Sequence, residues 1–309
     1  MTLTNSNKIR SEFNTHLPAL PYEEWKETYD TIHMLMQIVG KVKLALNPFI
    51  NQWWHITFQI TSSGLTTGLI PYNNEVFEIN FDFINHNLFI HTSSGQLKTI
   101  SLRPRSVADF YKEFIETLHA LEINIMVNTL PSEVPDPVPF ESDFKNSSYD
   151  KEYVYRWWYT MVRLWPIFEN FRSLFRGKSS PAHFFWGSFD LNVTRFSGST
   201  CTPPAKDRIM FFSENEENFS CGFWPGNSKY PMPAFYSYMY PAPNGIEKAD
   251  IKPTFASFNK NLGEFILPYE DVRKSSSPEQ LISQFFQSTY NESALLAGWN
   301  VKSLECQNP

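Results

Sequence analysis

Two stretches of the chain carry apolar residues at the spacing of an amphipathic helix. The first stretch begins at Tyr22, and its apolar residues are separated by four, three, four and three positions. Its stripe consists of Trp25, Tyr29, Ile32, Met36 and Val39. A second stripe with the same spacings begins at Trp157, 132 residues after Trp25, and continues to Phe175. The pattern predicts two long helices in corresponding places of two halves.

An alternating segment follows each predicted helix. A proline turn comes first, and residues 53–61 and 184–194 then alternate between apolar and polar side chains, which is the period of a strand. We therefore predict two strands, each with one apolar face and one face that combines a Trp with polar groups. The polar faces are Trp53, His55, Thr57, Gln59 and Thr61 in the first strand, and Trp186, Ser188, Asp190, Asn192 and Thr194 in the second.

Both halves are also predicted to end alike. A hairpin over residues 77–91 precedes Ser106, and a second hairpin over 255–267 precedes Ser277. Each serine is followed by a helical pattern, so each is a candidate N-cap, and Pro278 occupies the favoured first helical position. The resulting fold class is α+β, with two related helix–antiparallel sheet–helix halves, formed by internal duplication and packed together. The alternative is that amphipathic helices share this spacing by default.

A proline-rich, acidic segment separates the halves. It contains four prolines between residues 128 and 150, a composition typical of an extended linker. We predict an N-terminal tail over 1–19, the first α-β-β-β-α half over 20–127 and the linker over 128–150. The second half follows over 151–304, with an insertion around residues 201–218, and 305–309 form a C-terminal tail.

Composition narrows the classes of partner and compartment. The net charge is −6, which argues against nucleic acids and anionic membranes as partners. We see no secretory signal and no apolar run long enough to span a membrane. Three widely spaced cysteines suggest no disulfide framework, so a cytoplasmic location is expected. Nucleotide-binding, nucleophile-elbow and metal-ligand motifs are missing from the sequence, so we predict no cofactor and no metal.

Aromatic content is the unusual feature of the composition. The 309 residues include 28 Phe, 14 Tyr and 9 Trp, more rings than a core obviously needs. A Trp on a wet strand face is costly unless something covers it, so Trp53, Trp186 and Ser188 are candidate ligand-binding residues. The alternative is that both polar faces are simply solvated, as is common for antiparallel sheets.

Four ionisable residues are candidates for chemistry at these faces. His55 and His183 are candidate general acids or bases, and Asp190 is a candidate orienting or proton-transferring carboxylate. Asp190 lies seven positions after His183, so the two would share a site only if the strand bulged near Gly187. Arg195 is a candidate for binding an anionic group. Each of these residues also has a plain structural interpretation as a hydrogen-bonded or paired side chain.

A further aromatic group lies in the second half. Tyr236 and Tyr238 belong to an alternating tyrosine series bounded by prolines, and Trp224 precedes a sharp turn. We interpret them as candidate ligand-binding residues that form a stacking wall. The alternative is a strand that packs one face and lets its phenol groups reach water.

Several motifs together resemble a catalogued bacterial family. The resemblance covers nearly all of the chain after about residue 17. The motifs are Asn51-Gln52-Trp53-Trp54-His55, Leu102-Arg103-Pro104-Arg105-Ser106-Val107, His183-Phe184-Phe185-Trp186-Gly187-Ser188-Phe189-Asp190-Leu191, Gly222-Phe223-Trp224-Pro225-Gly226 and Leu267-Pro268-Tyr269-Glu270. They resemble domain-of-unknown-function family 5996. The resemblance implies a bacterial, cytoplasmic protein, and it supplies no activity, substrate or catalytic residue.

Two functional hypotheses follow from the sequence. The first is a soluble protein that binds a small polar organic ligand in an aromatic-lined pocket between the halves, with acid–base catalysis as an extension. The second is a non-catalytic module whose surplus aromatic residues form a surface for a partner protein or for homo-oligomers. An enclosed cavity lined by the named residues favours the first, and a flat exposed aromatic patch favours the second.

Overall fold

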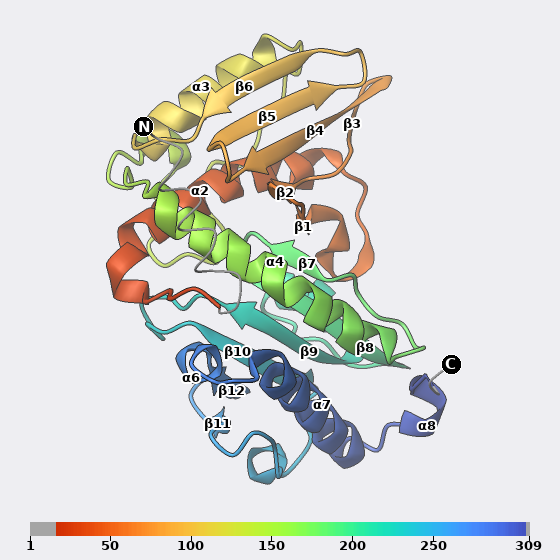
Figure 1. Cartoon of the computed structure of the whole chain (residues 1–309). Helices are drawn as coiled ribbons and strands as arrows, with labels where there is room; N and C mark the ends of the chain where they lie inside the picture. Colours follow the sequence, from red (N-terminus) through yellow and green to blue (C-terminus); the bar gives the residue numbers. More distant parts are fainter. Residues whose placement is uncertain (1–16, 307–309) are drawn as a thin grey trace.

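The computed structural model describes residues 17–306. The predicted N-terminal tail, 1–19, lies outside the described residues except for its last three positions. The predicted C-terminal tail, 305–309, lies outside them except for its first two. The chain folds into two antiparallel sheets with helices packed on them, so the predicted α+β class is confirmed (Figure 1).

The first half consists of a long helix, a six-stranded sheet and a second helix. The long helix, α2 (Tyr22–Leu46), begins at the residue where the apolar stripe predicts it. The strands are β1 (Gln59–Ile60), β2 (Gly64–Thr66), β3 (Ile70–Tyr72), β4 (Glu75–Asp82), β5 (Asn87–Thr92) and β6 (Leu97–Ser101). Their order in the sheet is β1-β2-β4-β5-β6, and β3 also pairs with β4. Helix α3 (Val107–His119) follows, and the predicted hairpin is β4 and β5.

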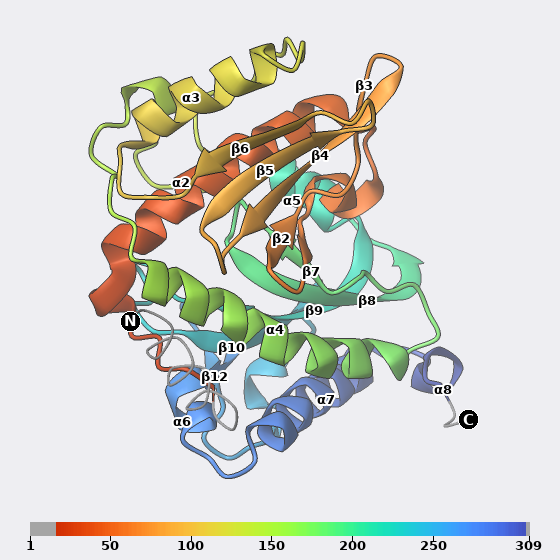
Figure 2. The same ribbon diagram turned by 45° about the horizontal axis from the view of Figure 1, so that its top comes forward.

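The second half repeats this order of elements with a larger insertion. Helix α4 (Lys151–Ser173) precedes a sheet in the order β11-β12-β10-β9-β8-β7, and helix α7 (Pro278–Leu296) packs beside α4 (Figure 2). The strands are β7 (His183–Phe185), β8 (Asp190–Thr200), β9 (Glu216–Trp224), β10 (Ala234–Tyr240), β11 (Ser257–Asn259) and β12 (Glu264–Pro268). The short helices are α5 (Arg208–Ser213), α6 (Tyr269–Arg273) and α8 (Val301–Leu304), with 3-10 turns η1 (Asn51–Ile56), η2 (Phe140–Ser142) and η3 (Ile246–Lys248).

The two predicted alternating strands are both wrong in part. Residues 53–56 belong to η1 and not to a strand, because Gln52 and Trp53 have φ angles of 55° and 62°, in the left-handed region. The segment 184–194 is not one strand but a hairpin, since Phe189, with φ 61°, closes a turn between β7 and β8. Each sheet has six strands, so the predicted three-strand unit is also too small. Internal duplication stays a prediction.

The two halves share one continuous apolar core. The sheets meet where Phe58 and Phe184 exchange backbone hydrogen bonds of 2.9 and 2.8 Å. Beside this junction, the fully buried indole of Trp157 on α4 contacts the rings of Phe184 and Phe189 in the second half and of Phe83 in the first. The aromatic stripes of the helices therefore pack both sheets together. No helix within residues 17–306 combines the length and the apolar character needed to cross a bilayer.

The two candidate N-caps differ in the structure. The Ser106 hydroxyl accepts a 3.1 Å hydrogen bond from the backbone N–H of Asp109, whereas the Ser277 side chain makes no capping bond to α7. We expect Ser106→Ala to lower the free energy of unfolding by about 1 kcal/mol, because one helical N–H loses its acceptor. Ser277→Ala is the matched control and should leave it nearly unchanged. Urea unfolding of both variants checks the difference, and equal effects would contradict it.

Candidate functional site

A cavity of about 1150 Å³ lies on one face of the second sheet. The opposite face of that sheet packs on helices α4 and α7, through residues such as Phe219 and Phe235. Because strand side chains alternate, the residues next to these on β9 and β10 point into the cavity. Asp190, Asn192 and Thr194 of β8 also line it, as the alternation predicts.

Strand register aligns the polar residues across the cavity floor. Thr194 pairs with Ser220, which pairs with Tyr238, and the side-chain oxygens of Thr194 and Ser220 are 2.7 Å apart. In the next row Gly222 lies between Asn192 and Tyr236. A Cβ at Gly222 would lie 2.4 Å from the Tyr236 ring, so only glycine lets this ring cross the strand.

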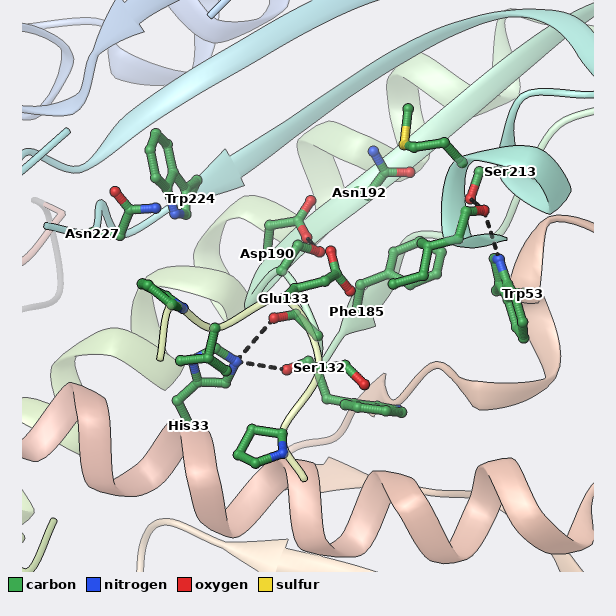
Figure 3. Close-up of a pocket in the computed structure, with 18 of the residues that line it drawn as sticks. His33, Trp53, Ser132, Glu133, Phe185, Asp190, Asn192, Ser213, Trp224 and Asn227 are labelled. Carbon is green, nitrogen blue, oxygen red and sulfur yellow. Dashed lines mark hydrogen bonds between the residues drawn. The ribbon is translucent and has the colours of Figure 1, made fainter. Parts of the chain in front are cut away.

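The predicted linker forms the opposing wall of the cavity. Ser132 is held to helix α2 by two bonds with the Gln37 side chain: its backbone N–H donates to Gln37 Oε1 at 2.8 Å, and its carbonyl accepts from Nε2 at 2.7 Å. Lys41 Nζ donates to Ser132 Oγ at 2.7 Å. These bonds place the next residue, Glu133, over the sheet, and Figure 3 shows its side chain beside that of Asp190. The linker is thus a structural part of the cavity.

Two tryptophans reach the cavity by different routes. Trp53, in its left-handed backbone conformation, donates from Nε1 to the carbonyl of Ile209 on α5 at 2.9 Å (Figure 3). Trp186 in the β7–β8 turn donates from Nε1 to the Ile56 carbonyl at 2.9 Å and is almost fully buried. Its indole packs where a Cβ at Gly40 would lie 2.3 Å away, so helix α2 approaches closely there.

His33 fixes the turn that carries Trp186. Its Nε2 lies 3.0 Å from the carbonyl oxygens of both Trp186 and Gly187, so Nε2 carries the proton and donates to them (Figure 3). Burial lowers the pKa of His33 to about 4, so the ring is neutral at pH 7. The sequence pattern does not single out this residue, because it is one of several polar interruptions in an apolar helix.

Five cavity carboxyl groups, Asp30 on α2 among them, have raised pKa values, chiefly because burial disfavours their charged forms. The pKa of Glu133 is raised to about 7 by burial and by Asp190, and that of Glu264 to about 7 by the same two causes. The pKa of Asp190 and that of Glu214 are also raised. The Glu133 carboxyl rests on Gly187, where a Cβ would lie 2.1 Å from Oε1. The cavity therefore holds carboxyl groups that exchange protons near neutral pH.

Seven of the ten residues predicted for a site line this one cavity. They are Trp53, Trp186, Ser188, Asp190, Trp224, Tyr236 and Tyr238. Asp190 accepts hydrogen bonds from Ser188 Oγ, at 2.5 Å, and from the Tyr236 hydroxyl. Their contact with a ligand stays a prediction. Of the four residues expected to line one cavity together, Trp53, Trp186 and Asp190 line it and His55 does not.

The other three predicted residues lie outside the cavity lining, which corrects the predicted arrangement. His55 is buried behind Trp53, and its Nδ1 accepts from the Ile50 backbone N–H at 3.2 Å. His183 lies on the same side of β7 as Phe185, but it is buried beneath the rings of Phe185 and Trp54, which line the cavity in its place. Arg195 lies on the core face of β8 because of its position in the alternation, with its guanidinium 3.4 Å from the Phe171 ring centroid.

Besides His33, sequence patterns missed several polar residues of the cavity, among them Glu133, Glu264, Glu214 and Asn218. Glu133 lies in a segment whose acids are expected to be solvated, and Glu264 begins a strand whose pattern is apolar. Glu214 and Asn218 lie in or beside the predicted insertion, where no repeat could be aligned. The alternation of β9 is the one pattern that could have placed Asn218 beside Ser220 on the cavity floor.

Comparison with known proteins gives a family but no activity. No curated protein and no solved structure matches the chain significantly. The model of the Family of unknown function (DUF5996) matches residues 17–306, which is nearly the whole chain. This protein therefore belongs to the DUF5996 family.

Proposed function

We propose that this protein binds a small polar organic ligand in the cavity between the second sheet, helix α2 and the linker. The observation that carries the proposal is convergence: polar strand faces, four tryptophans and a linker carboxylate meet at one cavity of about 1150 Å³. Ligand sites are concave, of roughly 300–1,000 Å³, and combine apolar walls with a few convergent polar groups. The cavity thus has room for a whole ligand of drug-like size.

The same cavity supports acid–base chemistry as part of the proposal. Burial and the nearby Asp190 raise the pKa of Glu133 to about 7, so this carboxyl group is partly protonated at pH 7. A general acid or base works best when its pKa is near the working pH. Glu133 and Asp190 are therefore better placed for this role than His55 and His183, which lie outside the cavity lining.

The position of the aromatic residues favours ligand binding over the alternative of an interaction module. Trp53, Trp186 and Tyr236 line a cavity, whereas a partner surface requires a broad exposed patch. The three cysteines, at 201, 221 and 306, are free, which supports a reducing, cytoplasmic location. The order helix, antiparallel sheet, helix in both halves supports an origin by internal duplication.

Screening by thermal shift tests the proposal. A chemically diverse fragment collection should contain compounds that raise the melting temperature, because a ligand at 100 times its Kd stabilises the folded state by about 2.7 kcal/mol. We expect Trp53→Ala and Asp190→Asn each to weaken binding of these compounds at least tenfold, as titration calorimetry would measure.

The control is Trp165→Ala. Trp165 is 44% exposed on α4 and does not line the cavity, so its loss should leave binding unchanged. Compounds whose affinity is the same in the wild type, Trp53→Ala and Asp190→Asn would show that the cavity is not the binding site.

A further inference from the structure

The cavity presents many more acidic than basic side chains. Lys145 and Lys229 are the two lysines among the described residues that line it, and no arginine is among them. The carboxyl groups come from helix α2, the linker, the end of helix α5 and the second sheet. They are Asp30, Glu133, Asp136, Asp143, Asp190, Glu214 and Glu264. This excess gives the cavity a negative potential, which favours a cationic ligand.

The hydrogen-bond donors on the cavity floor are already engaged. Tyr236 donates to Asp190, and the Tyr238 hydroxyl donates to Glu214 at 3.3 Å. Asn218 Nδ2 also donates to Glu214, at 2.5 Å. These internal bonds leave few donors for a ligand, so the floor offers a ligand mainly acceptors.

Three acceptors of the cavity have no donor within residues 17–306. The carboxyl groups of Glu133 and Glu264 accept no hydrogen bond and form no ion pair in this part of the chain. The side-chain oxygen of Asn218 is also without a partner, although this residue is only 1% exposed. A buried acceptor without a donor is costly, so the Asn218 oxygen marks where an N–H group of a ligand would bind. The exposed Glu133 carboxyl and the half-buried Glu264 carboxyl are accessible to further N–H groups of the same ligand.

Aromatic rings complete the chemistry of the walls. Trp53, Trp224, Tyr236 and Tyr238 all line the cavity, and Trp224 stacks with Tyr230 at 5.6 Å between ring centroids. The face of an aromatic ring attracts an organic cation through its quadrupole, and it also packs against apolar groups. Rings and carboxylates together are the usual surroundings of a bound ammonium group.

We propose that the ligand is an organic cation whose ammonium group binds the carboxyl groups around Asp190 and whose apolar part lies against the aromatic rings. This inference rests on the proposed function, because it assigns a chemical class to the same cavity. A neutral carbohydrate would need donors that the floor lacks. An organic anion would meet carboxylates with only two lysines to offset them.

The affinity for an organic cation should depend on whether the cavity carboxyl groups are protonated. The pKa values of Glu133 and Glu264 are both about 7, raised by burial and by Asp190; Asp207 also raises the pKa of Glu133, and Lys41 lowers it. A bound ammonium favours the charged carboxylate, so binding releases protons at pH 7. If one such group titrates, affinity for an amine should be about tenfold higher at pH 8 than at pH 6.

Three probes of matched shape test the charge of the ligand. Titration calorimetry with 2-phenylethylamine, 2-phenylethanol and phenylacetate compares a cation, a neutral alcohol and an anion that share one ring. We expect the amine to bind at least tenfold more tightly than the other two. Glu133→Gln and Glu264→Gln should each weaken amine binding about tenfold. Glu247→Gln removes the same charge from an exposed residue outside the cavity and should change nothing.

The outcomes separate this inference from the function on which it rests. If the alcohol or the anion binds more tightly than the amine, and Asp190→Asn weakens that binding, the ligand is not a cation but the cavity is still its binding site. Amine binding unchanged in Glu133→Gln and Glu264→Gln, or no amine binding at millimolar concentration, would overturn the cationic ligand as well. Both the cationic ligand and the proposed function would be overturned only if no compound of the fragment collection bound in a way that Trp53→Ala or Asp190→Asn weakens.

Discussion

Replacement of Trp157 by alanine is expected to lower the free energy of unfolding by about 3–5 kcal/mol. Trp157 is fully buried on α4, and its indole lies 4.8 Å from the Phe189 ring and 5.5 Å from the Phe184 ring, between centroids. Its removal would leave a cavity where the two sheets join, because these neighbours belong to separate elements that cannot all close in. Urea or guanidinium unfolding measures the loss.

Two further variants show whether packing is the cause. The Trp157 Nε1–H has no hydrogen-bond partner within residues 17–306, so Trp157→Phe keeps a ring, removes an unsatisfied donor and should cost less than half as much. Trp165→Ala removes an indole from the same helix, but this residue is 44% exposed, so the cost should stay below about 1 kcal/mol. Equal losses in all three variants would rule out a special role for the junction.

His183→Phe is expected to make the folded state more resistant to acid. Burial lowers the pKa of His183 to about 3, and Lys43 and Arg172 add to this effect. Its two ring nitrogens have no partner within residues 17–306, and its ring lies 4.7 Å from that of Phe185, so phenylalanine keeps the packing. Because the unfolded chain binds a proton near pH 6.5, the wild type loses stability as the pH falls from 6.5 towards 3.

The magnitude follows from the shift in pKa. At pH 4 the wild type should have lost ~3 kcal/mol through this one group, and His183→Phe should not lose it. Unfolding free energies of both proteins at a series of pH values between 7 and 4 measure the difference. A difference that stays constant over this range would show that the imidazole is not held neutral in the folded state.

The cavity carboxyl groups with raised pKa values change the free energy of unfolding with pH in the direction opposite to His183. Glu264, with a folded-state pKa of about 7, contributes stability that is fully present below its ordinary pKa of 4.5 and is lost as the pH rises through 7. In the wild type the two effects partly offset each other between pH 4.5 and 6.5. The comparison with His183→Phe isolates the histidine, because both proteins contain the same carboxyl groups.

Where the backbone is extended, alternation predicted which strand residues share a face. In β8 and β10 it placed Asp190, Asn192 and Tyr236 correctly, because successive side chains of a regular strand must point to opposite faces. It failed at the predicted start, Trp53, because Gln52 and Trp53 have left-handed backbones that break the period. Trp53 still lines the cavity, because its Nε1–H donates a hydrogen bond to the Ile209 carbonyl of α5. The alternation of the sequence could not predict this bond.

Long-range contacts explain what no local pattern could predict. Glu133 reaches the cavity because Gln37, 95 residues earlier than Ser132, fixes the linker backbone with two hydrogen bonds. A proline-rich acidic segment is usually solvated, so composition pointed away from this role. Likewise, Arg195 has the residue type of an anion ligand, but its place in the alternation puts it among the rings of the core.

The assembly of the cavity from both halves has a consequence for biosynthesis. Its walls begin with Tyr22 and end with Glu264, so a ribosome must have released most of the chain before the cavity exists. A nascent first half holds helix α2 and Trp53 but neither the floor nor the carboxyl group of Asp190. The proposed ligand would therefore stabilise only the finished protein, and shortage of it would expose complete chains, not nascent ones, to proteases.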